Sequence, residues 1–162
     1  MDLDHTEIPA TAVIPSNGGA RVWLESVSAG MRTVEAVIRE LSQNDVPVLV
    51  VAERGSGKAA AAARIHSLSG RAAEPFQVYQ AAEVDERVLA ALVGQGGTVY
   101  LQEVGDLSAA AQKELVRQIA LNGVEQRGFP RYICGTSREL EPEVRTGKFS
   151  ENLYYGISGR CV

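Results

Sequence analysis

The sequence predicts an α/β protein, a three-layer sandwich in which helices cover both faces of a parallel sheet of about five strands. Apolar, β-prone runs alternate along the chain with segments of helical periodicity. Strands that alternate with helices form right-handed βαβ units around a parallel sheet. In addition, the loop AERGSGKA at residues 52–59 follows the most apolar run of the chain and leads into an alanine-rich segment that favours a helix. Together they form a strand–loop–helix arrangement.

The first 45 residues are expected to hold a tail and one helix. Residues 1–20 contain two prolines and the run Ser16-Asn17-Gly18-Gly19 with little periodicity, so a flexible tail is expected there, with the domain over residues 21–162. A helix is expected from Val22, because apolar residues recur on one helical stripe at spacings of four and three. The members of this stripe are Val27, Met31, Val34, Ile38 and Leu41.

Four later apolar runs predict strands, and each is followed by a helical pattern. Strands are expected over residues 46–52, 76–79, 98–101 and 131–135. The first of them, VPVLVVA, is almost continuously apolar, which is typical of a parallel strand covered on both faces. Helices are expected over residues 59–68, 84–93 and 107–119, and short helical pieces over residues 140–155.

Length and composition favour one soluble domain with a core of its own. The chain has 162 residues, of which 45% are hydrophobic and 22% charged, and a net charge of −4. A long basic run, the usual sign of a nucleic-acid binder, is missing. No apolar stretch reaches membrane-spanning length and residues 1–10 do not resemble a signal peptide, so a cytoplasmic location is expected. Cys134 and Cys161 lack metal-ligand spacing and are expected to be buried or incidental thiols.

The loop at residues 52–59 is the strongest chemical signal. Consecutive small residues let backbone N–H groups point inward as an anion site, the following helix adds its positive end, and Lys58 adds a charge. The loop nearly matches the phosphate-binding pattern GxxxxGK[ST], with Ala52 for the first glycine and Ala59 for the hydroxyl residue that contacts Mg²⁺. A glycine-rich turn with a solvated lysine is the alternative. The predicted binding residues are Arg54, Gly55, Ser56, Gly57, Lys58 and Ala59.

A second signal is the end of the run GGTVYLQEVGD, residues 96–106. The apolar strand stops at Gln102 and Glu103. In nucleotide-hydrolysing proteins an acidic pair stands at this place, one acid for the metal and one for the water. Here the first of the pair is an amide, so the sequence leaves open whether the reaction has been kept.

Several segments together resemble the bacterial enhancer-binding proteins, which are NtrC-like AAA+ activators of sigma-54 RNA polymerase. VLVVAERGSGKA is similar to the VLITGESGTGKE of that family, and GGTVYLQEVGD to its GGTLFLDEIGD. CGTSREL, from Cys134, is similar to AATNRDL, and FSENLYYGI, from Phe149, to FREDLYYRL. The resemblance implies a P-loop NTPase-type fold, an AAA+ α/β subdomain. It also implies that the family's helical lid, its GAFTGA insertion after Gln95, its receiver domain and its helix-turn-helix are missing from this sequence.

The resemblance implies roles for single positions, and several of these depart from the family. Glu103 corresponds to the water-polarising glutamate and is expected to be vestigial, while Gln102 replaces the Mg²⁺-associated aspartate and is not expected to be a ligand. The family's glutamate-restraining asparagine, sensor asparagine and two finger arginines correspond to Gln80, Ser137, Ser150 and Gly156.

From these departures we expect a regulatory or interaction protein that binds ATP or ADP weakly, holds Mg²⁺ poorly and does not hydrolyse nucleotide by itself. The expected partner is a protein, in particular a full-length enhancer-binding protein or a related AAA+ subunit, with no direct DNA contact and no membrane. Two alternatives remain open. One is a residual ATPase or ATP-binding transcription regulator that works with arginine fingers from partner subunits, and the other is a scaffold that binds no nucleotide.

Overall fold

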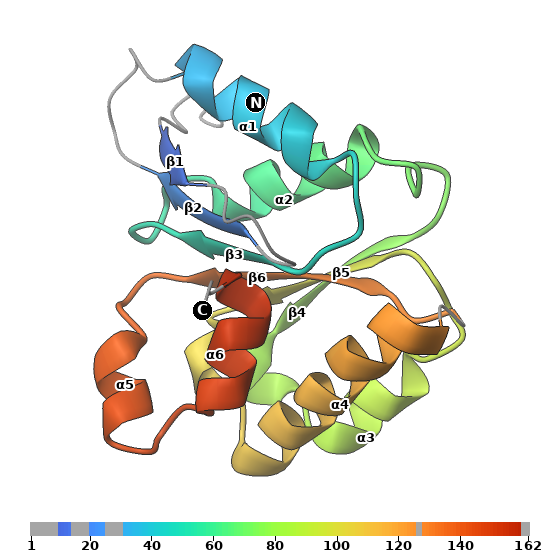
Figure 1. Ribbon diagram of the computed structural model, residues 1–162, viewed down its shortest axis with the longest axis vertical. Helices are drawn as coiled ribbons and strands as arrows, with labels where there is room; N and C mark the ends of the chain where they lie inside the picture. The colour runs from blue at the N-terminus through green and yellow to red at the C-terminus, as the bar shows by residue number, and fades with distance from the viewer. Residues whose placement is uncertain (1–9, 14–19, 25–30, 126–127, 160–162) are drawn as a thin grey trace.

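The computed structural model describes residues 10–13, 20–24, 31–125 and 128–159, and in this part of the chain one six-stranded sheet lies between two layers of helices (Figure 1). The strand order is β1-β2-β3-β6-β5-β4. The strands are β1 (Ala10–Val13), β2 (Ala20–Leu24), β3 (Val48–Val51), β4 (Phe76–Gln80), β5 (Thr98–Gln102) and β6 (Arg131–Thr136). The α-helices are α1 (Met31–Leu41), α2 (Lys58–Ser67), α3 (Glu86–Ala91), α4 (Ala109–Glu125), α5 (Glu141–Arg145) and α6 (Glu151–Ser158).

The parallel sheet expected from the sequence is confirmed. Strands β2, β3, β6, β5 and β4 pair in parallel, and β1 adds an antiparallel strand at one edge. β6 lies between β3 and β5, so the strand at the centre of the sheet comes from a late part of the chain. Every residue of β3 and β6 is buried, as expected for strands covered on both faces.

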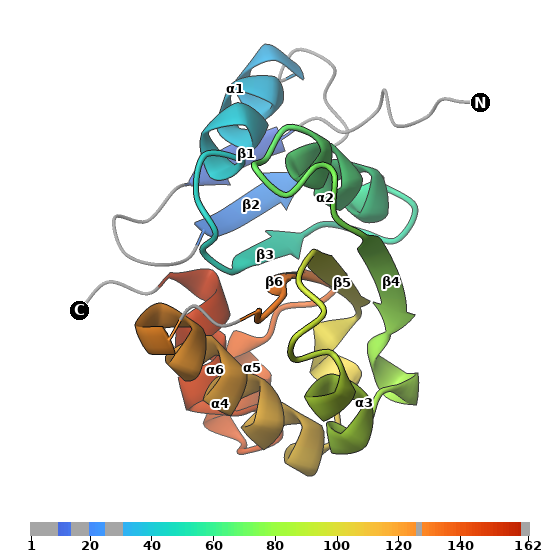
Figure 2. The same ribbon diagram turned by 90° about the vertical axis from the view of Figure 1, so that its right-hand side faces the viewer.

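Two hydrophobic cores lie on opposite faces of the sheet. Helices α1 and α2 cover one face, and α3, α4, α5 and α6 cover the other (Figures 1 and 2). The alternation of side chains along each strand divides the core: Val48 and Val50 face α1 and α2, whereas Leu49 and Val51 face the other layer. Within the described residues, no helix combines the length and the apolar character needed to cross a membrane.

The N-terminal expectation was wrong in two respects. Val22 lies in strand β2 rather than in a helix, and α1 begins only at Met31. Ala10–Val13, assigned to the tail, forms β1. Residues 1–9, 14–19 and 25–30, with Val27, lie outside the described residues, and the domain boundary at residues 20 and 21 stays a prediction. The helical stripe is confirmed from Val34 onward, where it is buried.

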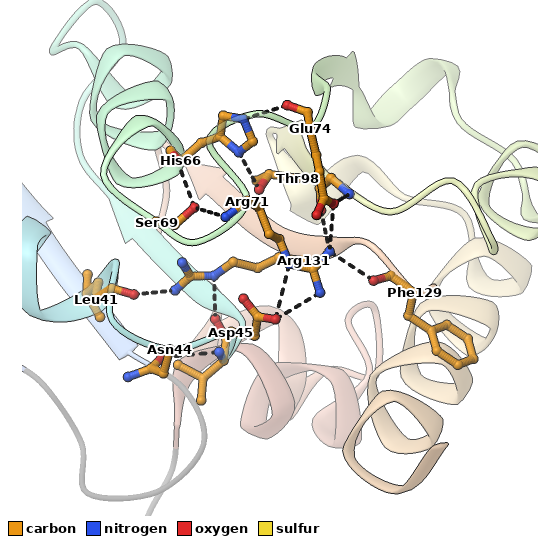
Figure 3. A network of polar contacts seen from close by, with 12 residues as sticks. Leu41, Asn44, Asp45, His66, Ser69, Arg71, Glu74, Thr98, Phe129 and Arg131 are labelled. Carbon is orange, nitrogen blue, oxygen red and sulfur yellow. Dashed lines mark hydrogen bonds and ion pairs between the residues drawn. The ribbon is translucent and has the colours of Figure 1, made fainter. Parts of the chain in front are cut away.

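A network of hydrogen bonds and ion pairs links the helices α1 and α2 to the edge of the sheet at which β5 and β6 begin (Figure 3). Arg131, only 1% exposed, donates hydrogen bonds to the carbonyl oxygens of Val46 and of Leu41, the last residue of α1. Burial lowers the pKa of the Arg131 guanidinium to about 10, so the group stays charged at neutral pH. Arg71 pairs with Asp45 at 2.9 Å and also donates to Gly97 O. These bonds tie α1 and α2 to the sheet.

Candidate phosphate-binding site

The loop after β3 has the backbone shape that an anion site requires. Gly55 and Gly57 both lie in the left-handed region, with φ of 76° and 91°, which a glycine adopts without strain. The first backbone hydrogen bond of α2 joins Ala61 N–H to Gly57 O at 2.9 Å. The N–H groups of the first helical residues, Lys58, Ala59 and Ala60, therefore have no backbone acceptor in the described chain. Free N–H groups at the positive end of a helix favour an anion.

Lys58 lies inside this loop and is not the solvated lysine of the alternative interpretation. Its side chain is 6% exposed, and Nζ donates to Ala52 O and Glu53 O, each at 3.0 Å. Burial lowers the pKa of Lys58, the nearby carboxylate of Glu103 opposes this shift, and Arg54 adds to it. The loop therefore holds a lysine ammonium by two of its own carbonyl groups, at the start of the helix where free N–H groups gather.

Glu103 has an unusual backbone conformation and a fixed carboxylate. Its φ of 58° makes it the one non-glycine residue with a positive φ among those described. Such backbone strain occurs often at functional sites. Its Oε1 accepts a hydrogen bond from the backbone N–H of Ser137 at 3.1 Å. The structure thus brings the ends of β5 and β6 together at Glu103, on the edge of the sheet where β3 leads into the phosphate loop.

Gln80 and Gln102 do not take part in holding this carboxylate. They are paired across β4 and β5 in register, and their side chains form no hydrogen bond within the described residues. The hydrogen bond to the Glu103 carboxylate comes from the Ser137 N–H and not from Gln80, the position to which the resemblance assigns that contact. Gln102 is half-buried at the end of β5, with a neutral amide where a carboxylate would bind a cation better.

Arg138 is a residue of this site that the sequence did not single out. Its guanidinium pairs with Asp106 at 3.1 Å and with Glu143 of α5, and its Nη1 lies 4.0 Å from Glu103 Oε1. Hydrogen bonds to Glu143 and Asp106 raise the pKa of Arg138. Its position two residues after the buried strand β6 was the available signal, since the residues that follow parallel strands lie at one edge of the sheet.

The positions of the finger arginines lie elsewhere. Ser150 is the N-cap of α6, where its Oγ accepts from Leu153 N–H at 3.1 Å, and Gly156 lies within the same helix. α6 is on the face of the sheet opposite α2 (Figure 1). These two positions therefore belong to the other helical layer from α2, the helix that follows the loop (Figure 1).

His66 and Cys134 lie in packed surroundings within the structure. His66 is buried, with Nδ1 at 2.8 Å from Thr98 Oγ1, Nε2 at 2.9 Å from Glu74 O, and its ring centroid 5.4 Å from that of Phe76. Cys134 is buried and Cys161 lies outside the described residues. In the described part of the chain, no group of three or more His, Cys, Asp and Glu residues could hold a metal ion.

The fold and the loop together define a P-loop protein of the AAA+ class. The family model of the sigma-54 interaction domain matches residues 26–162. The chain belongs to this family.

Similar proteins support the assignment. The Nif-specific regulatory protein of Klebsiella pneumoniae is 33% identical over 91% of this chain and 33% of its own length. The hydrogenase transcriptional regulatory protein HoxA of Cupriavidus necator is 34% identical over 78% of this chain and 32% of its own. The crystal structure of NtrX from Brucella abortus in complex with ADP is 25% identical, with a TM-score of 0.66 over 79% of this chain and 34% of that one. The chain thus spans about a third of the length of these relatives.

Proposed function

We propose that this chain is the nucleotide-binding part of a transcription regulator, that it binds ATP or ADP without hydrolysing it, and that it acts by contact with another protein. The observation behind the proposal is the phosphate loop: Lys58 lies beside the unpaired N–H groups that start α2. A nucleoside di- or triphosphate has the charge and the oxygen acceptors that such a loop binds. The relative NtrX has been crystallised with ADP, which supports the same ligand class here.

The residues present fit the phosphates better than they fit Mg²⁺. Ala59 offers a methyl group where the phosphate-loop pattern has a hydroxyl, and Gln102 offers a neutral amide. Mg²⁺ prefers charged oxygen ligands and keeps most of its waters. The protein would therefore contribute little to binding the ion, and the affinity for nucleotide should depend on Mg²⁺ only weakly.

Hydrolysis is not expected from the chain alone. Phosphoryl transfer depends on positioning and on neutralisation of charge, and an arginine finger contributes about 10³–10⁵ in rate. This corresponds to roughly 4–7 kcal/mol of activation free energy. Ser150 and Gly156 cannot supply that arginine to a neighbour.

The second candidate function is a residual ATPase that borrows arginines from partner subunits. The geometry of Glu103 favours it, because the Ser137 N–H holds that carboxylate at the edge of the sheet where the phosphate loop begins. A carboxylate in a fixed position could still orient an attacking water. The two candidates differ in one measurable property, which is release of phosphate in the presence of a partner.

A nucleotide titration by calorimetry, with and without Mg²⁺, tests the binding proposal. We expect binding of ATP and ADP by the unchanged chain and none by the Lys58→Ala variant. Lys113→Ala, which removes an exposed lysine of α4, is the matched control and should bind as the unchanged chain does. Equal binding by the Lys58→Ala variant would place the nucleotide elsewhere.

An assay of phosphate release tests the catalytic part of the proposal. The isolated chain should not exceed a blank without protein, and the Gln102→Asp variant should not either, because the arginines are still missing. Turnover that disappears in the Lys58→Ala variant would instead support the second candidate.

The proposed partner is a full-length enhancer-binding protein or a related AAA+ subunit. A subunit of this chain in such a ring would leave its neighbour without finger arginines, because the matching positions are Ser150 and Gly156. Mixing the chain with a purified activator should lower the ATPase rate of that activator. The Ser150→Arg/Gly156→Arg variant should inhibit less. An unchanged rate at every ratio, together with no complex in gel filtration, would refute this part.

A further inference from the structure

β4 is an open edge of the sheet. It is the last strand in the sheet order and pairs only with β5 in the described part of the chain. In Figure 2 it lies at the rim, with no described strand or helix alongside its outer side. One row of backbone N–H and C=O groups therefore faces outward along five residues. Such an edge is ready to pair with another strand.

The sequence of β4 has none of the usual protection against pairing. FQVYQ contains no charge and no proline, and valine and the two aromatic residues have high β propensity. Natural edge strands commonly carry lysine or proline, which hinder pairing. The amide side chains of Gln77 and Gln80 form no hydrogen bond within the described residues, so they are free to bond across the edge.

Val78 adds an uncovered apolar surface at the middle of this strand. It is 50% exposed and is the large hydrophobic residue exposed among the described side chains. Its register partner on β5 is Tyr100, whose side chain belongs to the core beneath α2, so Val78 is on the same face. Phe76, two residues earlier, packs against that core. The cover provided by α2 therefore includes the beginning of β4 but not its middle.

We propose that β4 pairs with β4 of a second copy of this chain, antiparallel, across a two-fold axis beside Val78. In this register Val78 lies opposite Val78 of the second copy, Gln77 opposite Tyr79, and Phe76 opposite Gln80. The pair joins the two sheets into one and satisfies the outer backbone groups of both strands. The two valines form the cross-strand contact that covers the exposed apolar surface.

A second copy fits this edge better than a different strand does. A two-fold pair is self-complementary, so both edges are satisfied at once. Because β4 is neutral, pairing it with itself places no like charges opposite one another. A strongly charged foreign strand would find no countercharge on β4. This inference does not depend on nucleotide binding, so its failure and that of the proposed function are distinguishable.

Sedimentation equilibrium of the purified chain over a range of concentrations tests the proposal. We expect a reversible dimer of twice the chain mass. The Val78→Lys variant places two like charges opposite each other at the axis, and its dissociation constant should rise at least about tenfold. The Ala120→Lys variant, which changes an exposed residue of α4 on the opposite face of the sheet (Figure 1), should dimerise as the unchanged chain does. Thermal unfolding of all three verifies that they are folded.

Disulfide trapping locates the contact. Residues directly opposite in an antiparallel pair have Cα atoms about 4.5–5.5 Å apart, which a disulfide can span. In a Cys161→Ser background, Val78→Cys should form a covalent dimer on mild oxidation, and Ala120→Cys on the opposite face of the sheet (Figure 1) should not. A chain that stays monomeric at all concentrations overturns the proposal. A dimer that persists in the Val78→Lys variant and is not trapped by Val78→Cys overturns it as well.

Discussion

The hydroxyl of Tyr100 lies against the backbone of Gly135, so close that a Cβ atom at residue 135 would overlap it. Tyr100 is on β5 and Gly135 on the neighbouring strand β6. The phenol oxygen is buried and has no hydrogen-bond partner in the described structure. Glycine is therefore required at residue 135 because of the ring beside it, and not because of its backbone angles.

The Gly135→Ala variant should lower the free energy of unfolding by about 1–3 kcal/mol, the usual effect of overpacking a core. Gly156→Ala is the matched control in helix α6. The nearest atom to a Cβ there is Cγ2 of Ile119 at 3.8 Å, an ordinary contact. Alanine is a better helix former than glycine, so the free energy of unfolding of this variant should rise by about 0.5–1 kcal/mol. Urea denaturation measures both, and a stabilised Gly135→Ala variant would contradict the argument.

Two buried tyrosines should respond differently to loss of their hydroxyl group. Tyr132 Oη donates to Gln118 Oε1 at 2.6 Å, and both side chains are buried. Tyr132→Phe leaves that amide oxygen without a donor and should lower stability by about 1–3 kcal/mol. Tyr100→Phe removes a hydroxyl that has no partner, so stability should be unchanged or higher. Thermal unfolding of the two variants side by side tests this. Equal losses would mean that Tyr100 does have a partner, such as a buried water.

Burial raises the pKa of the Cys134 thiol to about 12, from an ordinary value of 9.0. In a Cys161→Ser background, the thiol should not react with Ellman's reagent at pH 8 until denaturant is added. The unfolded chain loses this proton near pH 9 and the folded chain does not. The contribution of Cys134 to stability is therefore complete below pH 9 and decreases by about 1.4 kcal/mol per pH unit above it.

Replacing the thiol separates its contribution from that of the buried tyrosines. Burial raises the pKa of Tyr100 and Tyr132 as well, so they also reduce stability at high pH. The Cys134→Ala variant should lose stability less steeply than the Cys161→Ser background between pH 9 and 10.5. Denaturation at several pH values in this interval gives both slopes, and parallel slopes would show that the thiol titrates normally.

Arg138 should contribute to stability in a salt-dependent manner. Its side chain is 40% exposed and lies among the carboxylates of Glu103, Asp106 and Glu143. Partly exposed ion pairs are each worth about 0–1 kcal/mol and are screened by salt. The free energy of unfolding of the Arg138→Met variant should therefore be lower by about 1 kcal/mol at low ionic strength, and by less at 1 M salt. Arg117→Met removes the ion pair of exposed Arg117 with one carboxylate, that of Glu114, and serves as control, with a smaller loss of stability. A loss that is equal at both salt concentrations would contradict an electrostatic role.

The strand–loop–helix arrangement around residues 52–59 could be predicted because its parts are adjacent in the sequence. Gly55, Gly57 and Lys58 fall within four residues, and the strand before them and the helix after them have clear local patterns. A helix forms its hydrogen bonds within its own segment, so a periodic apolar stripe is enough to predict it. Buried parallel strands were equally visible, because they are apolar along their whole length.

The contacts that complete the site were decided by the tertiary structure. The Ser137 N–H reaches Glu103 from 34 positions away, and Arg138 reaches Asp106 from 32 positions away. A helix was expected from Val22, yet Val22 lies in the strand Ala20–Leu24, which pairs in parallel with β3. A strand takes its hydrogen-bond partners from a distant segment, so a short one without a continuous apolar run has no local signal. The sequence by itself determined the helices, the buried strands and the phosphate loop. Which segments lie beside one another, and which groups fix Glu103, was decided only when the sheet brought their ends to one edge.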